Sequence, residues 1–468
     1  MGLKENKYCV YFLFCLAILP ILFLRDFTPS NELRYLSIAD EALRNHTLFT
    51  FTNHGMPYAD KPPLYLWLVM LLKSILGSHQ MWALALLSLI PALVTVHTMD
   101  RWSNREIDST NRLIAQRMLL TCGIFAGSIL TIRMDMLMCM FIVLAMRSFW
   151  RLYTYEDGYR RERWFFPVFL FLALFTKGPL GILIPLFATL VFLIISRQYN
   201  RIFQIWGWRT WGLLLLCCGI WFGMVYAEGG HEYLDNLLFH QTIDRAVHAF
   251  HHNHPFYYYF ICIWYCIAPW TIHITSAFAM SLRKSTVKSP LHVLYLTTAL
   301  TTIALLSCLS GKLEIYLIPA FPFMIYATVM YFPKVSSKTW GRFCQDKFFS
   351  RCTLGIFVLL FVGGLCLPYY NKYIGYGELC KEVIKLSENE HIGNIAAWNV
   401  SNAADMDVYL HQSVNVIDQI DSLETSIKCP SLLITKTKHQ GYFSGCEIKN
   451  VGDYCIVKLT DATVCKKK

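Results

Sequence analysis

Charged residues are scarce in this sequence. They make up only 16% of its 468 residues, whereas hydrophobic residues make up 55%. A soluble globular chain carries roughly 25% charged residues, so this composition excludes an ordinary soluble protein and indicates many membrane spans. The sequence also lacks a metal-ligand spacing, an internal repeat and a low-complexity linker. It therefore indicates no metal and no cofactor.

Apolar segments long enough to cross a bilayer core of about 30 Å recur along most of the chain. The first has no small-residue cleavage site and leads into further spans, so we interpret it as a retained helix. The segment 62–77 is short and begins with two prolines, and we expect it to lie along the outer surface. We predict about eleven transmembrane helices, near residues 8–25, 80–98, 113–132, 135–153, 164–176, 179–196, 210–227, 257–281, 290–309, 314–332 and 352–368.

Lysines and arginines in the short loops predict the orientation. If the N-terminus is cytoplasmic, basic loops such as 101–112, 151–163 and 197–209 all fall on the cytoplasmic side. The net charge of +11 then reflects membrane topology, and nucleic-acid binding is a poor explanation of it. The compact chain without long loops favours a bacterial inner membrane protein.

The composition changes near residue 370 to that of a soluble domain. We therefore predict a transmembrane domain over residues 1–370 and a small extracytoplasmic α/β domain over 371–468. Strand-like runs at 395–400, 414–417, 432–435 and 454–459 alternate with polar, helix-like stretches. Five cysteines fall in this segment, which in an oxidising compartment allows one or two disulfides of undefined pairing. They are Cys380, Cys429, Cys446, Cys455 and Cys465.

A second group of basic residues falls on the outer side, against the topology rule. Such charges at helix ends require desolvation, so several together indicate that an anion binds there, and a lipid phosphate is the recurrent anion at that depth. For Arg25, Arg44 and Lys73 we expect contact with bulk headgroups instead. The group consists of Arg25, Arg34, Arg44, Lys61, Lys73, Arg133, Lys177, Arg245 and Lys312.

Two outer motifs each combine an acid with a base. "NELRY" (31–35) lies at the start of a predicted amphipathic interfacial helix, 28–45, whose apolar side we expect to face the membrane. "YADKPP" (58–63) precedes the second surface helix. Together they could frame a pocket in which two cations neutralise a departing phosphate and a carboxylate orients or deprotonates the nucleophile. A capped helix with a solvated charged face is the alternative.

Six motifs in order resemble those of the membrane glycosyltransferases of the GT-C type. They are "NELRY", "YADKPP", "RMD" (133–135), "TKGP" (176–179), "HQTIDR" (240–245) and "GKLEIY" (311–316). The branch of aminoarabinose (lipid A) transferases and related protein O-mannosyltransferases looks closest, over residues 8–370. The resemblance implies an all-α polytopic fold, a polyprenyl-phosphate-linked sugar donor, a lipid, glycan or protein acceptor outside, and inversion at the anomeric carbon.

The resemblance also implies roles for individual residues. Arg34 and Lys61 would hold the donor phosphate, and three tyrosines would line the donor site, namely Tyr35, Tyr58 and Tyr316. Supporting positions are Lys177, Asp135, Arg245 and Lys312.

The first motif departs from the family pattern. The family opens it with Asp-Glu, and this sequence has Asn31-Glu32. Three interpretations are open. Glu32 or Asp60 acts as the base, the acceptor is an anionic phosphate that needs no strong base, or the protein is weakened or inactive. We favour the first two.

A lipid-linked sugar flippase and a binding scaffold are the competing functions. A transporter should have polar or broken helices near the bilayer midplane. In this sequence the polar residues gather at the outer ends of spans, which favours an enzyme. The His-rich segment 248–254 is more simply explained as an outer loop than as a metal site.

Overall fold

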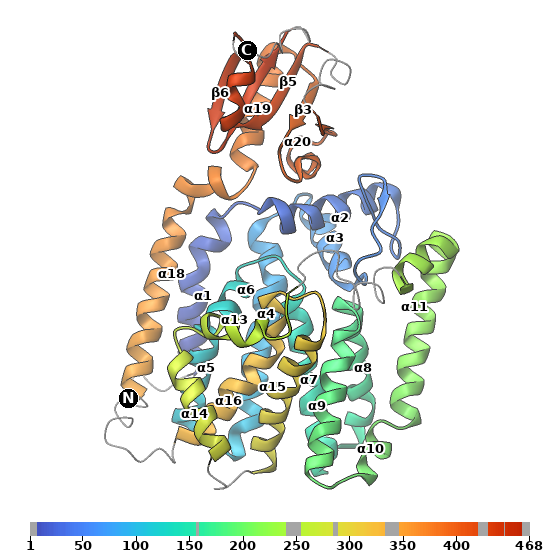
Figure 1. The fold of residues 1–468 in the computed structure, drawn as a ribbon, viewed down its shortest axis with the longest axis vertical. Helices are drawn as coiled ribbons and strands as arrows, with labels where there is room; N and C mark the ends of the chain where they lie inside the picture. The colour runs from blue at the N-terminus through green and yellow to red at the C-terminus, as the bar shows by residue number, and fades with distance from the viewer. Residues whose placement is uncertain are drawn as a thin grey trace.

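A bundle of long helices carries a small sheet domain at one end (Figure 1). This computed structural model describes residues 7–155, 159–239, 254–283, 289–332, 346–419, 429–443 and 445–460. Within those ranges, seven helical segments are long and apolar enough to cross a membrane. They are α1 (Lys7–Leu24), α4 (Met81–Trp102), α7 (Asp135–Thr154), α11 (Trp208–Asp235), α15 (Pro290–Cys308), η4 (Glu314–Ala320) with α16 (Phe321–Tyr331), and α18 (Asp346–Ile374).

The other predicted spans are also helical, but two of them are broken. The spans at 164–176 and 179–196 correspond to α8 (Tyr159–Lys177) and α9 (Leu180–Ile195). The span at 113–132 divides into α5 (Ser109–Leu120) and α6 (Gly123–Ile129), and that at 257–281 into α13 (Tyr258–Cys266) and α14 (Thr271–Arg283).

The two breaks lie against each other and exchange the polar contacts that an unbroken helix would satisfy internally. The Gly123 N–H donates to the Ala268 carbonyl at 2.8 Å, and the Trp270 indole N–H donates to the Thr121 hydroxyl at 2.9 Å. A Cβ at Gly123 would lie 3.3 Å from the Ala268 oxygen, so glycine permits this close approach.

The two outer helices form where the motifs predict them. A short π-helical turn, η1 (Pro29–Leu33), leads into α2 (Arg34–Asn45), and α3 is Leu64–Leu76. Between them lies a small hairpin of β1 (Thr52–Asn53) and β2 (Met56–Pro57). The prediction that the apolar side of α2 faces the membrane is wrong, because α2 is covered by protein. It lies between α3 and the C-terminal domain, in one apolar cluster with residues of both (Figure 1).

The C-terminal segment is an α/β unit, as predicted. It contains α19 (Gly377–Glu390), η6 (Ala403–Met406), α20 (Asp407–Leu410) and η8 (Thr437–Phe443) beside one sheet. The sheet order is β4 (Asn415–Ile417), β3 (Asn394–Trp398), β5 (Ser431–Lys436), β7 (Tyr454–Leu459) and β6 (Glu447–Val451). β3 pairs in parallel with β4 and β5, whereas β7 runs antiparallel to β5 and β6.

The disulfide expectation is wrong for the four cysteines of this domain that the structure describes. Cys380, Cys429, Cys446 and Cys455 are free thiols. Cys380 packs in the apolar cluster shared with α2 and α3, whereas the other three belong to a separate cluster within the domain. Cys465 lies outside the described residues.

Partly buried carboxylates attach the C-terminal domain to the bundle. Asp26, just after α1, accepts a hydrogen bond from the Gly377 N–H at 2.7 Å and another from the Tyr409 hydroxyl. A Cβ at Gly377 would lie 2.7 Å from the Asp26 carboxylate, so only glycine fits there without displacement. On the other side of the interface, the Ser37 hydroxyl donates to Asp407 at 3.0 Å.

His54, in the β1–β2 turn, completes this interface. Its Nε2 lies 2.9 Å from Asp405, and its Nδ1 lies 3.9 Å from Asp407. The hydrogen bond with Asp405 raises the pKa of His54, and the charges of Asp407 and Glu41 raise it further against the opposing effect of burial. Burial also raises the pKa of the Asp407 carboxyl.

We therefore predict that docking of the hairpin on the C-terminal domain weakens as the pH rises. Because the pKa of His54 is raised, its contribution is complete below its ordinary value of about 6.5 and is lost as the pH passes through the raised value. Hydrogen–deuterium exchange of residues 52–57 in wild type and His54→Gln, compared at each pH, measures the effect. The exchange rates of wild type and His54→Gln should differ below pH ~6.5 and become equal at alkaline pH. A difference in exchange rate that does not change with pH contradicts the prediction. So does an equally large difference between wild type and His46→Asn, the control at an exposed histidine.

Candidate active site

The candidate site is built around a buried carboxylate, Asp135. It begins α7, and its side chain is only 2% exposed. Lys177, the last residue of α8, forms an ion pair with one carboxylate oxygen, and Arg133 Nε lies 3.3 Å from the other. A buried charge is tolerated only when it is paired in this way. The Lys177 ammonium also lies 4.1 Å from the centre of the Tyr316 ring, a cation–π distance.

The opening of α3 places Lys61 beside this centre. Its ammonium lies 3.2 Å from the Asp60 carboxylate, and the Tyr58 hydroxyl lies 3.3 Å from the other oxygen of that carboxylate. Burial lowers the pKa of Lys61 and the positive charges of Arg34 and Arg133 lower it further, whereas the Asp135 carboxylate opposes this shift. Lys61 therefore lies close enough to Asp135, Arg34 and Arg133 for their charges to affect its own.

Arg34 and Tyr35 bring the first motif to the same cluster. The Arg34 guanidinium lies 5.9 Å from the centre of the Tyr35 ring, which packs edge-on against Tyr65 at 6.0 Å. Arg34 Nε and the Tyr65 hydroxyl are buried, and neither has a hydrogen-bond partner in the described part of the chain. Buried polar atoms are nearly always paired, so these two donors are suited to an acceptor-rich ligand.

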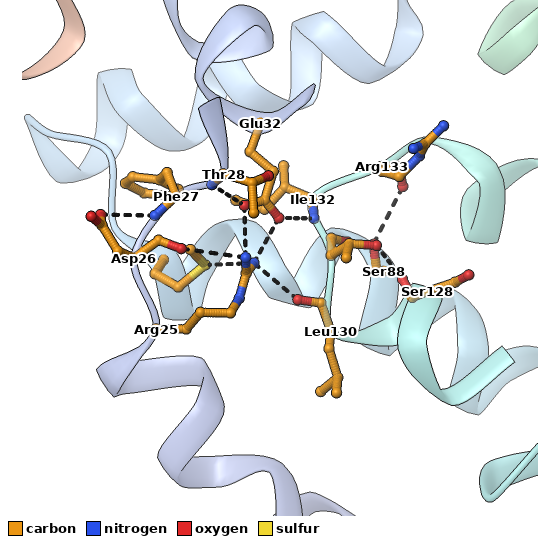
Figure 2. A network of polar contacts seen from close by, with 12 residues as sticks. Arg25, Asp26, Phe27, Thr28, Glu32, Ser88, Ser128, Leu130, Ile132 and Arg133 are labelled. Carbon is orange, nitrogen blue, oxygen red and sulfur yellow. Dashed lines mark hydrogen bonds and ion pairs between the residues drawn. The ribbon is translucent and has the colours of Figure 1, made fainter. Parts of the chain in front are cut away.

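Glu32 has a structural role that the sequence did not reveal (Figure 2). Its carboxylate receives two hydrogen bonds from the Arg25 guanidinium, at 2.6 and 2.8 Å, and one each from the backbone N–H groups of Thr28 and Ile132, both at 2.8 Å. Arg25 also donates to the Leu130 carbonyl at 3.0 Å. The expectation that Arg25 contacts headgroups is therefore wrong. The Arg25–Glu32 ion pair connects the end of α1 to η1 and to the loop before Arg133. The hydrogen bonds from Arg25, Thr28 and Ile132 engage both oxygens of Glu32.

Two more of the outer cations also have protein partners. Lys73 forms an ion pair with Asp40, which His79 contacts at 2.7 Å, so the headgroup expectation is wrong for Lys73 as well. Lys312 is 3% exposed and donates to the carbonyls of Leu309 and His254. Its ammonium closes the turn after α15, which accounts for its burial without a phosphate.

The remaining predicted residues lie outside the cluster or outside the described residues. Asn31 is partly exposed, and its side-chain amide donates to the Ser30 hydroxyl at 3.4 Å. Arg44 is exposed at the end of α2, which is compatible with the headgroup expectation. Arg245 lies in 240–253, outside the described residues, together with most of the His-rich segment.

Sequence reasoning missed a clamp at the outer end of α11. The Glu228 carboxylate accepts hydrogen bonds from three consecutive N–H groups of the loop after α2, those of Leu48, Phe49 and Thr50, at 2.8–3.2 Å. The Tyr233 hydroxyl donates to the Tyr58 carbonyl and accepts from the Phe51 N–H, both at 2.9 Å. The clamp thus fixes the chain two residues before Asp60. The only sign of this clamp in the sequence is an acid followed by Gly229-Gly230 within an otherwise apolar helix.

Comparisons with known proteins agree with this geometry. Residues 60–222 match the family described as dolichyl-phosphate-mannose-protein mannosyltransferase. The chain is 25% identical, over 373 residues, to the undecaprenyl phosphate-α-4-amino-4-deoxy-L-arabinose arabinosyl transferase of Shewanella sediminis. The alignment covers 77% of this chain and 67% of that protein. These similarities support a GT-C glycosyltransferase related to the aminoarabinose transferases and protein mannosyltransferases.

Solved structures show the same fold. ArnT from Cupriavidus metallidurans bound to undecaprenyl phosphate superposes with a TM-score of 0.74 at 14% identity, over 98% of both chains. The oligosaccharyltransferase AglB from Archaeoglobus fulgidus, in complex with an inhibitory peptide and a dolichol-phosphate, gives 0.51 at 11% identity, over 93% of this chain and 70% of that one. The polytopic helical fold with a C-terminal domain is therefore confirmed.

We predict that Glu32→Gln mainly destabilises the protein. Breaking a buried ion pair by removing one partner destabilises by about 3–5 kcal/mol, because the other charge stays buried. Thermal unfolding in detergent should show a large fall in melting temperature, which the double variant Arg25→Met/Glu32→Met partly restores. A Glu32→Gln protein that melts like wild type but has lost activity would identify Glu32 as the base.

A second prediction concerns the clamp. A Cβ at position 229 would lie 2.5 Å from the Thr50 methyl group, whereas one at position 223 of the same helix has open space. Gly229→Ala should therefore displace the loop that carries Asp60 and Lys61, and a displacement of about 1 Å reduces turnover on the order of 10²-fold. Gly223→Ala is the matched control. Equal activity of the two variants, with similar melting temperatures, contradicts a positioning role.

Proposed function

We propose that this protein transfers a single sugar from a polyprenyl-phosphate-linked donor to an acceptor on the outer side of a bacterial inner membrane. The observation that carries the proposal is the convergence of Arg34 and Lys61 with the Asp135–Lys177 pair at the outer helix ends. The names of the relatives support a lipid-phosphate carrier, since the Shewanella protein is named for undecaprenyl phosphate and the ArnT structure holds it.

In this proposal the cations act on the leaving group. The bond between the anomeric carbon and the phosphate oxygen breaks, and its electron pair leaves with the phosphate. Arg34 offers donors in a planar fork that fits phosphate oxygens, and Lys61 adds a compact positive charge, so both stabilise the charge that develops as the bond breaks. Asp135 holds Lys177 against Tyr316 and thereby fixes the wall of the site.

The carboxylate of Asp60 acts on the acceptor. Both oxygens of Glu32 are engaged by Arg25 and by backbone N–H groups, whereas Asp60 is the acid of the two motifs that pairs with Lys61 of the site. A hydroxyl acceptor gives its proton to Asp60 as it attacks from the face opposite the phosphate, which inverts the anomeric carbon. A phosphate acceptor is already anionic and needs Asp60 only for orientation. Asn31, where the family has Asp, fits either acceptor.

The rest of the proposal concerns the architecture. The transmembrane part spans 1–370 and the extracytoplasmic domain spans 371–468, with the N-terminus in the cytoplasm. The acceptor is a lipid A-type lipid, a glycan or an exported protein. A flippase would need polar groups along a path through the bundle, whereas the cluster described here lies at the ends of α7 and α8.

We predict that Arg34→Ala and Lys61→Ala each reduce sugar transfer by at least about 10²-fold, the loss typical when one preorganised charge-stabilising donor is removed. Transfer from a polyprenyl-phosphate sugar in reconstituted vesicles is the measurement. Arg44→Ala, an exposed arginine of the same helix, is the matched control. Wild-type turnover in both site variants, with normal folding, removes this site assignment.

The identity of the base gives a separate prediction. Asp60→Asn should lower kcat, whereas Asn31→Asp should be tolerated or raise it. A steady-state comparison of the two variants over pH 5–9 (roughly the range in which a perturbed carboxylate titrates) measures this. Loss of activity in Asn31→Asp together with full activity in Asp60→Asn contradicts the assignment of Asp60.

A further inference from the structure

A pocket of about 400 Å³ opens at the end of the bundle opposite the C-terminal domain. It lies between the beginning of α8, the short helix α10 (Asn200–Ile205) and the beginning of α11, which Figure 1 shows at the far end from the sheet. Its lining includes Tyr155, Tyr159, Arg163, Arg201, Trp208 and Arg209. Three arginines and several aromatic rings thus surround one hollow that the proposed transfer reaction does not use.

Each arginine lies over an aromatic ring. The Arg163 guanidinium lies 5.4 Å from the centre of the Tyr159 ring, that of Arg201 4.6 Å from Tyr155, and that of Arg209 5.5 Å from Trp208. Such stacking holds a guanidinium in place while leaving its N–H groups at the edge for an acceptor.

The arginines of the pocket are not neutralised by acids. In the described part of the chain, neither Arg163 nor Arg209 forms an ion pair with a carboxylate. The acid next to Arg163 in sequence, Glu162, is engaged by Arg151 and by the Ser148 hydroxyl. The positive-inside rule accounts for basic residues at this end of the bundle, but not for their convergence on one hollow.

The position of Arg209 adds a second argument. Arg209 is the second residue of α11, a helix of 28 residues, so its charge lies at the positive end of a helix dipole. A cation there is unfavourable by itself, whereas an anion between Arg209 and the first turn would be stabilised by both.

Two exposed aromatic side chains belong to the lining of the pocket. Phe203 is 83% exposed and Trp208 is 78% exposed. Exposed aromatic rings at the end of a membrane bundle lie at the level of lipid headgroups. An anion held by the arginines and flanked by these rings therefore has an apolar continuation, which describes a phospholipid better than a soluble anion.

We propose that this pocket binds the phosphate headgroup of an anionic phospholipid in the leaflet opposite the transfer site. The guanidinium groups of Arg163 and Arg209 hold the phosphate oxygens, as basic pockets between transmembrane helices do. Phe203 and Trp208 contact the glycerol and the first carbons of the acyl chains. The bound lipid joins α8, α10 and α11 at that surface.

The experiment compares two double variants of the full chain by native mass spectrometry. All four arginines are exposed, but Arg163→Gln/Arg209→Gln alters the lining of the pocket, whereas Arg160→Gln/Arg161→Gln removes the same charge from positions of α8 that do not line it. Each protein is ejected from nanodiscs of phosphatidylcholine that contain a minor fraction of phosphatidylglycerol. The pocket variant should bind phosphatidylglycerol at least about tenfold more weakly, because each charge-assisted hydrogen bond contributes about that factor. The control should stay within about twofold of wild type.

Two further arms separate a lipid from a free anion and from a folding defect. Millimolar inorganic phosphate should leave the bound phosphatidylglycerol in place, and the melting temperatures of the two double variants should agree. Equal retention of phosphatidylglycerol by both variants overturns the proposal. Displacement of the lipid by inorganic phosphate overturns the lipid assignment. Sugar transfer is not the readout, so the result is independent of the proposed enzymatic function.

Discussion

The buried carboxylate of Asp135 organises the outer face of this protein. A carboxylate that is 2% exposed at the start of a transmembrane helix requires cationic partners, and these are Lys177 at the end of α8 and Arg133, two residues before α7. The ion pair holds the beginning of α7 next to the end of α8. Tyr316 of η4 covers the Lys177 ammonium. In the proposed reaction, Asp135 thereby holds one wall of the site in which Lys61 and Arg34 would bind a phosphate.

The loops that carry the motifs are held by side chains from distant parts of the chain. Arg25 and Glu32 tie the end of α1 to the loop before Arg133, and Glu228 captures the loop after α2 through its backbone N–H groups. The C-terminal domain covers α2, and its Asp405 contacts His54 of the β1–β2 turn. Loops fixed on several sides lose little freedom when a ligand binds, which is what a preorganised transferase site needs.

The sequence predicted much of this because apolar segments and misplaced charges are local signals. All eleven predicted spans coincide with helical segments, and the unusual outer cations led to Lys61, Lys177 and Arg34. The errors concern partners distant in sequence. Arg25 and Lys73 looked lipid-facing because nothing local showed that Glu32 and Asp40 neutralise them. The burial of α2 depends on a domain more than 300 residues further along the chain, since Ser37 and Asp407 are 370 residues apart.

The account depends on recognition of a phosphate by the Arg34–Lys61 cluster, and one binding measurement tests it most directly. The affinity of the purified protein for a short-chain polyprenyl phosphate is compared with that for the corresponding polyprenol, which has the same chain and no charge. Two charge-assisted contacts predict that the phosphate binds at least about 100-fold more tightly, and that Arg34→Gln removes most of this difference. Equal affinity for the phosphate and the alcohol would contradict the account.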